Sequence, residues 1–136
     1  MKTIQLKNTK RKNAQQLYNY LLSKIDFQEL EQLNAMPVYY SAAEWFAENL
    51  GNSTYVNLED EDIQTLLTLR SGNKQIEEIC NITGFSVQSV RSKINKLLMR
   101  GLVFSYLEES NKKNRRNYYK LTPYGDQELK KALLDN

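Results

Sequence analysis

Hydrophobic residues recur at helical spacing through the first half of the chain. In residues 10–25 they fall at i, i+1, i+4, i+5 and i+8, which predicts a helix. The helix continues or resumes as far as Leu33, and Met36-Pro37 is expected to end it. The pattern then predicts a short apolar link at residues 38–40, a capping box at residues 41–44 that opens a helix ending at Gly51, a loop, and a further helix over residues 60–70.

Residues 74–101 have the pattern of two short helices joined by a glycine turn. Apolar side chains share one face of the first helix, and Gly84 can adopt the positive φ that a tight turn requires. Ser86 is a suitable N-cap for the second helix, and Gly101 stands where a helix often ends in a left-handed residue. The apolar stripe of the second helix comprises Val87, Val90, Ile94, Leu97 and Leu98. Because polar side chains cover its other faces, the segment predicts a helix-turn-helix.

The segment after Gly101 predicts a β-hairpin with a basic tip. Residues 102–107 alternate in the manner of a strand, residues 108–116 are polar and basic, and residues 117–121 return as a second strand. Thr122-Pro123 then matches an N-cap followed by proline at the first helical position, so a closing helix is expected to run to about Leu134. A cationic hairpin beside a recognition helix is the arrangement of a wing that reaches the DNA backbone or minor groove.

These elements predict a mainly α fold with a small β-hairpin, an α+β winged helix-turn-helix. We expect residues 59–136 to form the winged domain with its closing helix. Residues 1–58 are expected to form a helical extension used for packing or dimerisation. This extension carries eight aromatic residues, more than two amphipathic helices can bury alone. They are therefore expected to pack either on the closing helix of the same chain or on a second subunit, and a homodimer is favoured.

Three segments carry a resemblance to a known family. They are Gly84-Phe85-Ser86-Val87-Gln88-Ser89-Val90, Leu97-Leu98-Met99-Arg100-Gly101-Leu102-Val103, and the run from Asn114 to Gly125 that contains Arg115-Arg116 and Leu121-Thr122-Pro123. Over residues 58–134 the chain resembles the MarR-type winged helix-turn-helix transcription regulators. The resemblance implies a DNA-binding regulator, a repressor, that acts as a homodimer. One departure is that Lys112, Lys113 and Asn114 occupy positions where the family usually has an acidic residue before the wing arginine.

The charge distribution supports the same function. The whole chain carries a net charge of +3, but residues 86–121 contain nine Lys or Arg residues against two acids, a local net charge of +7. The remainder of the chain is therefore slightly acidic, at −4. A cationic face on an acidic body attracts phosphate and orients the approach to duplex DNA.

Composition excludes several other classes. The chain has no histidine, so no Ser-His or Cys-His pair is available for nucleophilic catalysis, and we expect no enzymatic activity. With a single cysteine it can form neither an internal disulfide nor a zinc-finger site, and no cofactor is expected. No stretch approaches the roughly 20 apolar residues of a membrane span, so the expected location is the cytoplasm.

The candidate DNA-binding residues belong to the recognition helix, residues 86–100, and to the wing, residues 108–117. Gln88 can bind an adenine edge and Arg91 a guanine, because their side chains match the major-groove donors and acceptors of those bases. Ser86 is the N-cap, while Ser89 and Ser92 can serve either a base or a phosphate. Val87 can pack in the core or contact a thymine methyl group. Lys93, Asn95 and Lys96 are expected to hold the DNA backbone. The wing candidates are Lys112, Lys113, Asn114, Arg115 and Arg116.

Two other functions remain open from the sequence. One is an accessory DNA-binding protein of a plasmid or phage that acts in replication, excision or partition. The other is a winged domain that binds protein, against which the basic wing argues. A small-molecule effector of unknown identity is also compatible with the sequence.

Overall fold

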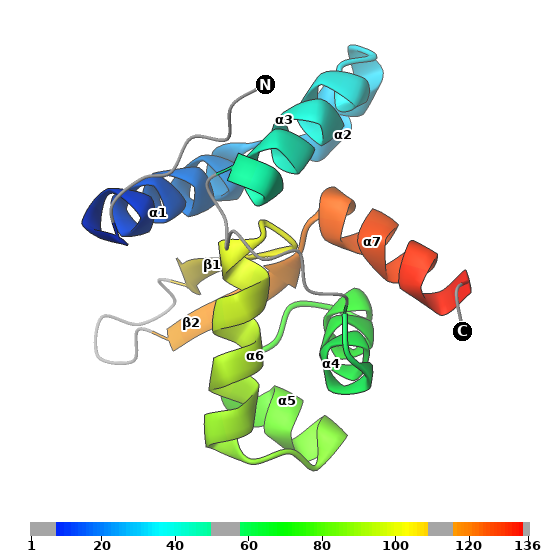
Figure 1. The fold of residues 1–136 in the computed structure, drawn as a ribbon. Helices are drawn as coiled ribbons and strands as arrows, with labels where there is room; N and C mark the ends of the chain where they lie inside the picture. The colour runs from blue at the N-terminus through cyan, green and yellow to red at the C-terminus, as the bar shows by residue number, and fades with distance from the viewer. Residues whose placement is uncertain (1–7, 50–57, 109–115, 135–136) are drawn as a thin grey trace.

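The computed structural model describes residues 8–49, 58–108 and 116–134. Its helices are α1 (Asn8–Lys24), α2 (Phe27–Gln32), α3 (Met36–Asn49), α4 (Asp60–Arg70), α5 (Ile76–Thr83), α6 (Val87–Met99) and α7 (Pro123–Leu134). Its strands are β1 (Val103–Glu108) and β2 (Arg116–Leu121), which pair antiparallel with Val103 opposite Leu121. The chain is a mainly α fold with a small hairpin, as predicted. Figure 1 shows α1–α3 at one end of the molecule and α5 at the other.

The signals at the ends of the helix-turn-helix work as the sequence predicted. Gly84 ends α5 with a φ of +78°, and the Ser86 hydroxyl then accepts a hydrogen bond from the Ser89 N–H at 3.1 Å. Gly101 has a φ of +72° just beyond α6, and α7 begins at Pro123. Both glycines occupy the left-handed region, which side chains with a Cβ rarely adopt. The turn and the ends of the second helix are therefore fixed locally.

The prediction for residues 36–44 is wrong. Met36-Pro37 begins α3 instead of ending a helix, so the expected link at 38–40 and the expected capping box at 41–44 both lie inside α3. Proline is tolerated in the first turn of a helix because the N–H that it lacks has no partner there. The preceding helix, α2, ends at Gln32 with Leu33 as its C-cap, and Asn34 follows at a φ of +57°. The expected helix end at Gly51 and the loop after it lie outside the described residues.

Two apolar clusters hold the molecule together. The larger one lies among α4–α7 and the hairpin, which together are called the winged unit below. Its fully buried members include Leu66, Ile79, Val90 and Leu97. The smaller one joins the N-terminal helices to the hairpin. Its buried residues are Leu22 of α1, Tyr39 and Ala43 of α3, and Phe104 of β1. A strand of the winged unit therefore completes the core of the N-terminal helices.

This second cluster accounts for much of the aromatic content of residues 18–46. Tyr18 of α1 stacks on Phe46 of α3 with ring centroids 3.8 Å apart, and Phe27 meets Tyr39 edge to face at 4.9 Å. The Tyr39 hydroxyl also accepts a hydrogen bond from the Tyr124 N–H of α7 at 3.1 Å. Packing within one chain thus covers five of these aromatics wholly or in part, whereas Tyr20 and Trp45 stay exposed.

The hairpin is held along both of its edges. Ser105 and Tyr119 lie opposite each other, and their backbone polar groups point away from the partner strand. On the β2 side, Lys74 and Tyr119 exchange two backbone hydrogen bonds at 2.9 and 3.1 Å. On the β1 side, the Asn19 carboxamide of α1 accepts from the Ser105 N–H at 2.9 Å and donates to its carbonyl oxygen at 3.2 Å. Elements on either side therefore fix the orientation of the hairpin.

Candidate nucleic-acid interface

Helix α6 presents a continuous polar face to solvent. Gln88, Arg91, Ser92 and Asn95 are all exposed, whereas Val90, Ile94 and Leu97 are buried in the core of the winged unit. The spacing of the exposed set, i, i+3, i+4 and i+7, places these side chains on one side of a helix. Four side chains that can donate or accept hydrogen bonds thus form a strip about two turns long, and a strip of this kind can meet base edges in a groove.

Val87 lies at the start of this strip rather than in the core. The sequence assigned it to the apolar stripe, with contact to a thymine methyl group as an alternative. The structure leaves 44% of the residue exposed. An exposed aliphatic side chain beside Gln88 and Arg91 fits the second interpretation, because the thymine methyl group is the apolar feature of the major groove.

Ser89, Lys93 and Lys96 occupy the flank of α6 that leans towards α4. The Lys93 ammonium lies 3.0 Å from a carboxylate oxygen of Glu61, and the Lys96 ammonium lies 2.6 Å from one of Asp62. The carboxylate of Glu61 raises the pKa of Lys93, chiefly through their hydrogen bond. The sequence assigned both lysines to the DNA backbone. In the structure each has an intramolecular partner with which a DNA phosphate would have to compete.

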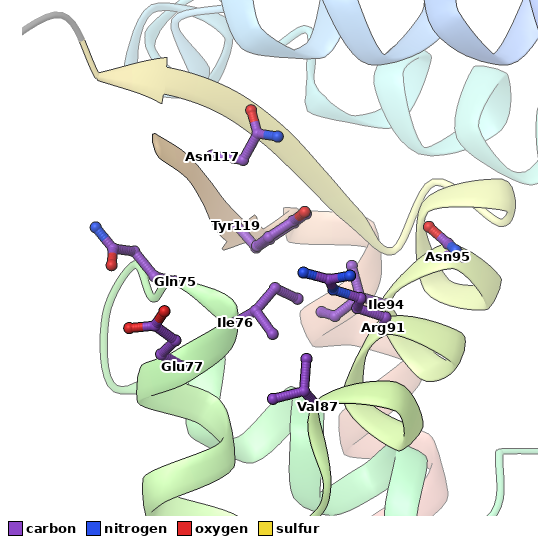
Figure 2. A pocket seen from close by; sticks show the side chains of 9 residues that line it. All are labelled: Gln75, Ile76, Glu77, Val87, Arg91, Ile94, Asn95, Asn117 and Tyr119. Atoms are coloured by element: carbon purple, nitrogen blue, oxygen red, sulfur yellow. The ribbon is translucent and has the colours of Figure 1, made fainter. Parts of the chain in front are cut away.

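A hollow of about 520 Å³ separates α6 from the hairpin. Figure 2 shows Ile76 of α5, Tyr119 of β2, and Val87 and Arg91 of α6 converging on it, with Asn117 of β2 at its rim. Burial raises the pKa of the Tyr119 phenol, and the neighbouring positive charge of Arg91 partly opposes that rise. Tyr119 therefore shapes the surroundings of a predicted base reader.

Sequence reasoning missed the two β2 residues of this hollow. Asn117 was predicted to be the last residue of the wing and the first of the second strand, and Tyr119 to be part of that strand, but neither was named as a DNA-binding residue. A signal was present, since residues 117, 119 and 121 share one side of the strand and Leu121 packs against the core beside α6. That parity places the side chain of Asn117 on the α6 side of the hairpin.

The basic tip of the wing cannot be placed in the same way. Lys112, Lys113, Asn114 and Arg115 lie outside the described residues. Arg116 opens β2 opposite Glu108, and the structure describes its backbone only. The geometry of the interface therefore rests on α6, the start of α5 and β2.

The chain matches no protein-family model and no curated protein. Its fold matches solved structures of transcription regulators. PadR of Bacillus subtilis, in complex with operator DNA, gives a TM-score of 0.52 at 20% identity, over 57% of this chain and 48% of PadR, so this chain spans about half of PadR. BldR of Sulfolobus solfataricus gives 0.52 at 19% identity, over 77% of this chain and 73% of BldR.

A third structure is BpsR of Bordetella bronchiseptica, whose DNA binding is regulated by 6-hydroxynicotinic acid. It gives a TM-score of 0.52 at 16% identity, over 74% of this chain and 70% of BpsR. These likenesses show the fold: this chain is a winged helix-turn-helix protein. None of the described helices is long and apolar enough to cross a membrane.

Proposed function

We propose that this chain is a sequence-specific, duplex-DNA-binding transcription regulator, a MarR-like repressor. The observation that carries the proposal is the exposed polar strip of α6, formed by Gln88, Arg91, Ser92 and Asn95. Helix α6 has 13 residues, and the side that carries these residues is exposed to solvent. A helix with one exposed polar side fits the major groove of DNA. The PadR structure supports the proposal, because a protein of the same fold is bound there to operator DNA.

In this proposal the base readers and the phosphate contacts come from different elements. Gln88 and Arg91 contact base edges in the major groove of DNA. Asn117 and Tyr119 of β2 face the same major groove. The cations of the wing, residues 112–116, hold phosphates or enter the minor groove, as the sequence suggested. The core of the winged unit does not depend on the side chains of the polar strip, so Gln88 and Arg91 can be altered without removing buried apolar contacts.

The test is to select bound duplexes from random DNA and then titrate variants on the selected site and on a random duplex. Arg91→Ala and Gln88→Ala should each cost about 1–3 kcal/mol of binding free energy on the selected site and much less on random DNA. Lys130→Ala serves as the matched control, because it removes an exposed cation from α7 whose only described ion pair is the exposed one with Asp126. Failure of the parent chain to bind any duplex at low salt would instead favour a winged unit that binds protein.

We also propose that the regulator is a homodimer. Leu17, Tyr20 and Leu21 of α1 stay exposed at i, i+3 and i+4, and they form an apolar strip that a second copy can cover. Sedimentation at micromolar concentration should then give about twice the 15.9 kDa mass of the chain. A palindromic selected site with half-sites about 10 bp apart would report the same symmetry. A monomer both with and without DNA would exclude the dimer.

A further inference from the structure

The acidic start of α4 lies against the flank of the recognition helix. Glu59, Asp60, Glu61 and Asp62 follow one another there, and two of them form ion pairs with lysines of α6. The two pairs differ in burial. The side chain of Asp62 is 1% exposed and that of its partner Lys96 is 27% exposed. The side chain of Glu61 is 52% exposed, so water and counterions reach the Glu61–Lys93 pair.

That difference in burial decides which pair can exchange partners. Opening the Lys96 pair would leave a buried carboxylate without its cation, which is strongly unfavourable. Opening the Lys93 pair leaves Glu61 in contact with water, and pairs of this exposed kind contribute little to stability. Lys93 is therefore the lysine on this flank that can move between an internal carboxylate and an external anion.

Lys93 also lies where an external phosphate would approach. It follows Ser92 of the polar strip by one residue, and its side chain is 17% exposed. The pKa of Lys93 is raised by Glu61 first, and then by the more distant carboxylates of Asp62 and Glu59. The ammonium group thus keeps its charge at neutral pH and is held by the acidic start of α4.

We propose that Glu61 is a specificity-determining residue, which competes with DNA phosphate for Lys93 and so weakens binding to non-specific duplex. The inference rests on the proposed function. Non-specific affinity comes almost entirely from phosphate contacts, each of which releases counterions. A contact by Lys93 either breaks the Glu61 pair or draws the Glu61 carboxylate beside the phosphate, and in both cases that carboxylate attracts a cation. The net release of counterions through Lys93 is therefore close to zero.

The effect falls unequally on the two kinds of DNA. On a random duplex the protein is free to shift until a freed Lys93 meets a phosphate. On the specific site, base contacts by Gln88 and Arg91 fix the register, so a freed lysine can gain less. Glu61 therefore raises the ratio of specific to non-specific affinity without touching DNA itself.

The experiment compares Glu61→Gln with Asp60→Asn. Both remove one negative charge from the first turn of α4, but Asp60 is exposed and holds no ion pair among the described residues. The Glu61→Gln variant should bind random duplex up to about fivefold more tightly than the parent, the most that an exposed pair is worth. The slope of log affinity against log salt should steepen by about 0.9, one additional phosphate contact. Affinity for the selected site should change less than twofold.

A double variant assigns the effect to Lys93. In a Lys93→Gln background, Glu61→Gln should leave both the random-duplex affinity and the salt slope unchanged. If Glu61→Gln and Asp60→Asn behave alike, or if the effect persists without Lys93, the inference fails while the proposed function stands. If neither the parent nor Glu61→Gln binds duplex DNA at low salt, the proposed function and this inference fail together.

Discussion

Replacement of Lys96 by methionine tests whether this lysine holds the fold or holds DNA. The Lys96 ammonium lies 2.6 Å from Asp62, whose side chain is 1% exposed. The same carboxylate oxygen accepts the Glu59 N–H at 2.9 Å, and the other oxygen of Asp62 has no partner in the described part of the chain. Methionine keeps most of the apolar stem of the side chain and removes the charged ammonium group. Asp62 would then be a buried carboxylate compensated by one backbone N–H.

The expected loss is large because the burial is uneven. Deleting one partner of a fully buried pair costs about 3–5 kcal/mol, whereas deleting one partner of an exposed pair costs about 0.2–1 kcal/mol. Since Lys96 is 27% exposed, water partly stabilises the carboxylate that remains. We expect Lys96→Met to lower the free energy of unfolding by about 2–4 kcal/mol, a shift of roughly 1–2 M in the urea midpoint.

Urea unfolding followed by circular dichroism measures this loss, and two variants serve as references. Lys93→Met removes the exposed pair with Glu61 and should cost less than about 1 kcal/mol. Adding Asp62→Asn to Lys96→Met removes the uncompensated charge, so part of the lost stability should return. The reasoning is refuted if Lys96→Met is no more destabilising than Lys93→Met. If Lys96→Met kept its stability and lost only DNA affinity, with a shallower salt slope, Lys96 would be a phosphate contact.

Two glycine substitutions test packing and backbone conformation, and two tyrosine substitutions with a pH titration test the buried phenols. A Cβ on Gly125 would lie 2.0 Å from the Leu102 carbonyl oxygen, so Gly125→Ala should lower the free energy of unfolding by about 2–3 kcal/mol in thermal or urea unfolding. At Gly84 the space is open but φ is +78°, so Gly84→Ala should lower it by about 1–2 kcal/mol. The Tyr18 hydroxyl is buried without a partner in the described residues, whereas that of Tyr39 accepts a hydrogen bond. Tyr18→Phe should therefore be neutral or stabilising, and Tyr39→Phe destabilising by about 1 kcal/mol. Burial raises the pKa of both phenols, so the stability that their neutral forms contribute is complete below about pH 10. This stability falls as the pH rises above that value, and Tyr18→Phe should make the fall shallower.

The features that could be predicted from the sequence are those with local causes. Ser86 caps α6, Gly84 ends α5, and Pro123 starts α7, because each depends on backbone groups within a few residues. Pro37 shows the limit of the same reasoning. A proline can follow the end of a helix or stand in its first turn, and the local pattern allowed both. Tyr39, Ala43 and the rest of the buried face of α3 resolve the ambiguity, but the elements that cover that face are α1, β1 and α7.

The contacts that shape the candidate interface join distant positions and have no spacing signature. Lys96 and Asp62 are 34 residues apart, and Asn19 and Ser105 are 86 apart. Lys93 and Lys96 were assigned to DNA because a lysine on a recognition helix is a reasonable phosphate ligand. The sequence cannot show that acidic residues of another helix face the same flank. The exposed set of α6, by contrast, follows from helical periodicity alone.

The N-terminal helices therefore do more than extend the winged unit. The Asn19 carboxamide occupies the outer edge of β1 as a neighbouring strand would, and Lys74 does the same for β2. Phe104 of β1 is buried among side chains of α1 and α3. A two-stranded hairpin is marginal by itself, since most of the stability of small sheets comes from further pairing and from packing. The orientation of β2, and with it the placement of Tyr119 beside Arg91, is thus set jointly by the helix-turn-helix and by α1 and α3, which lie far earlier in the chain. In the proposed regulator, an alteration in α1 should therefore change recognition by Arg91 through the position of β2.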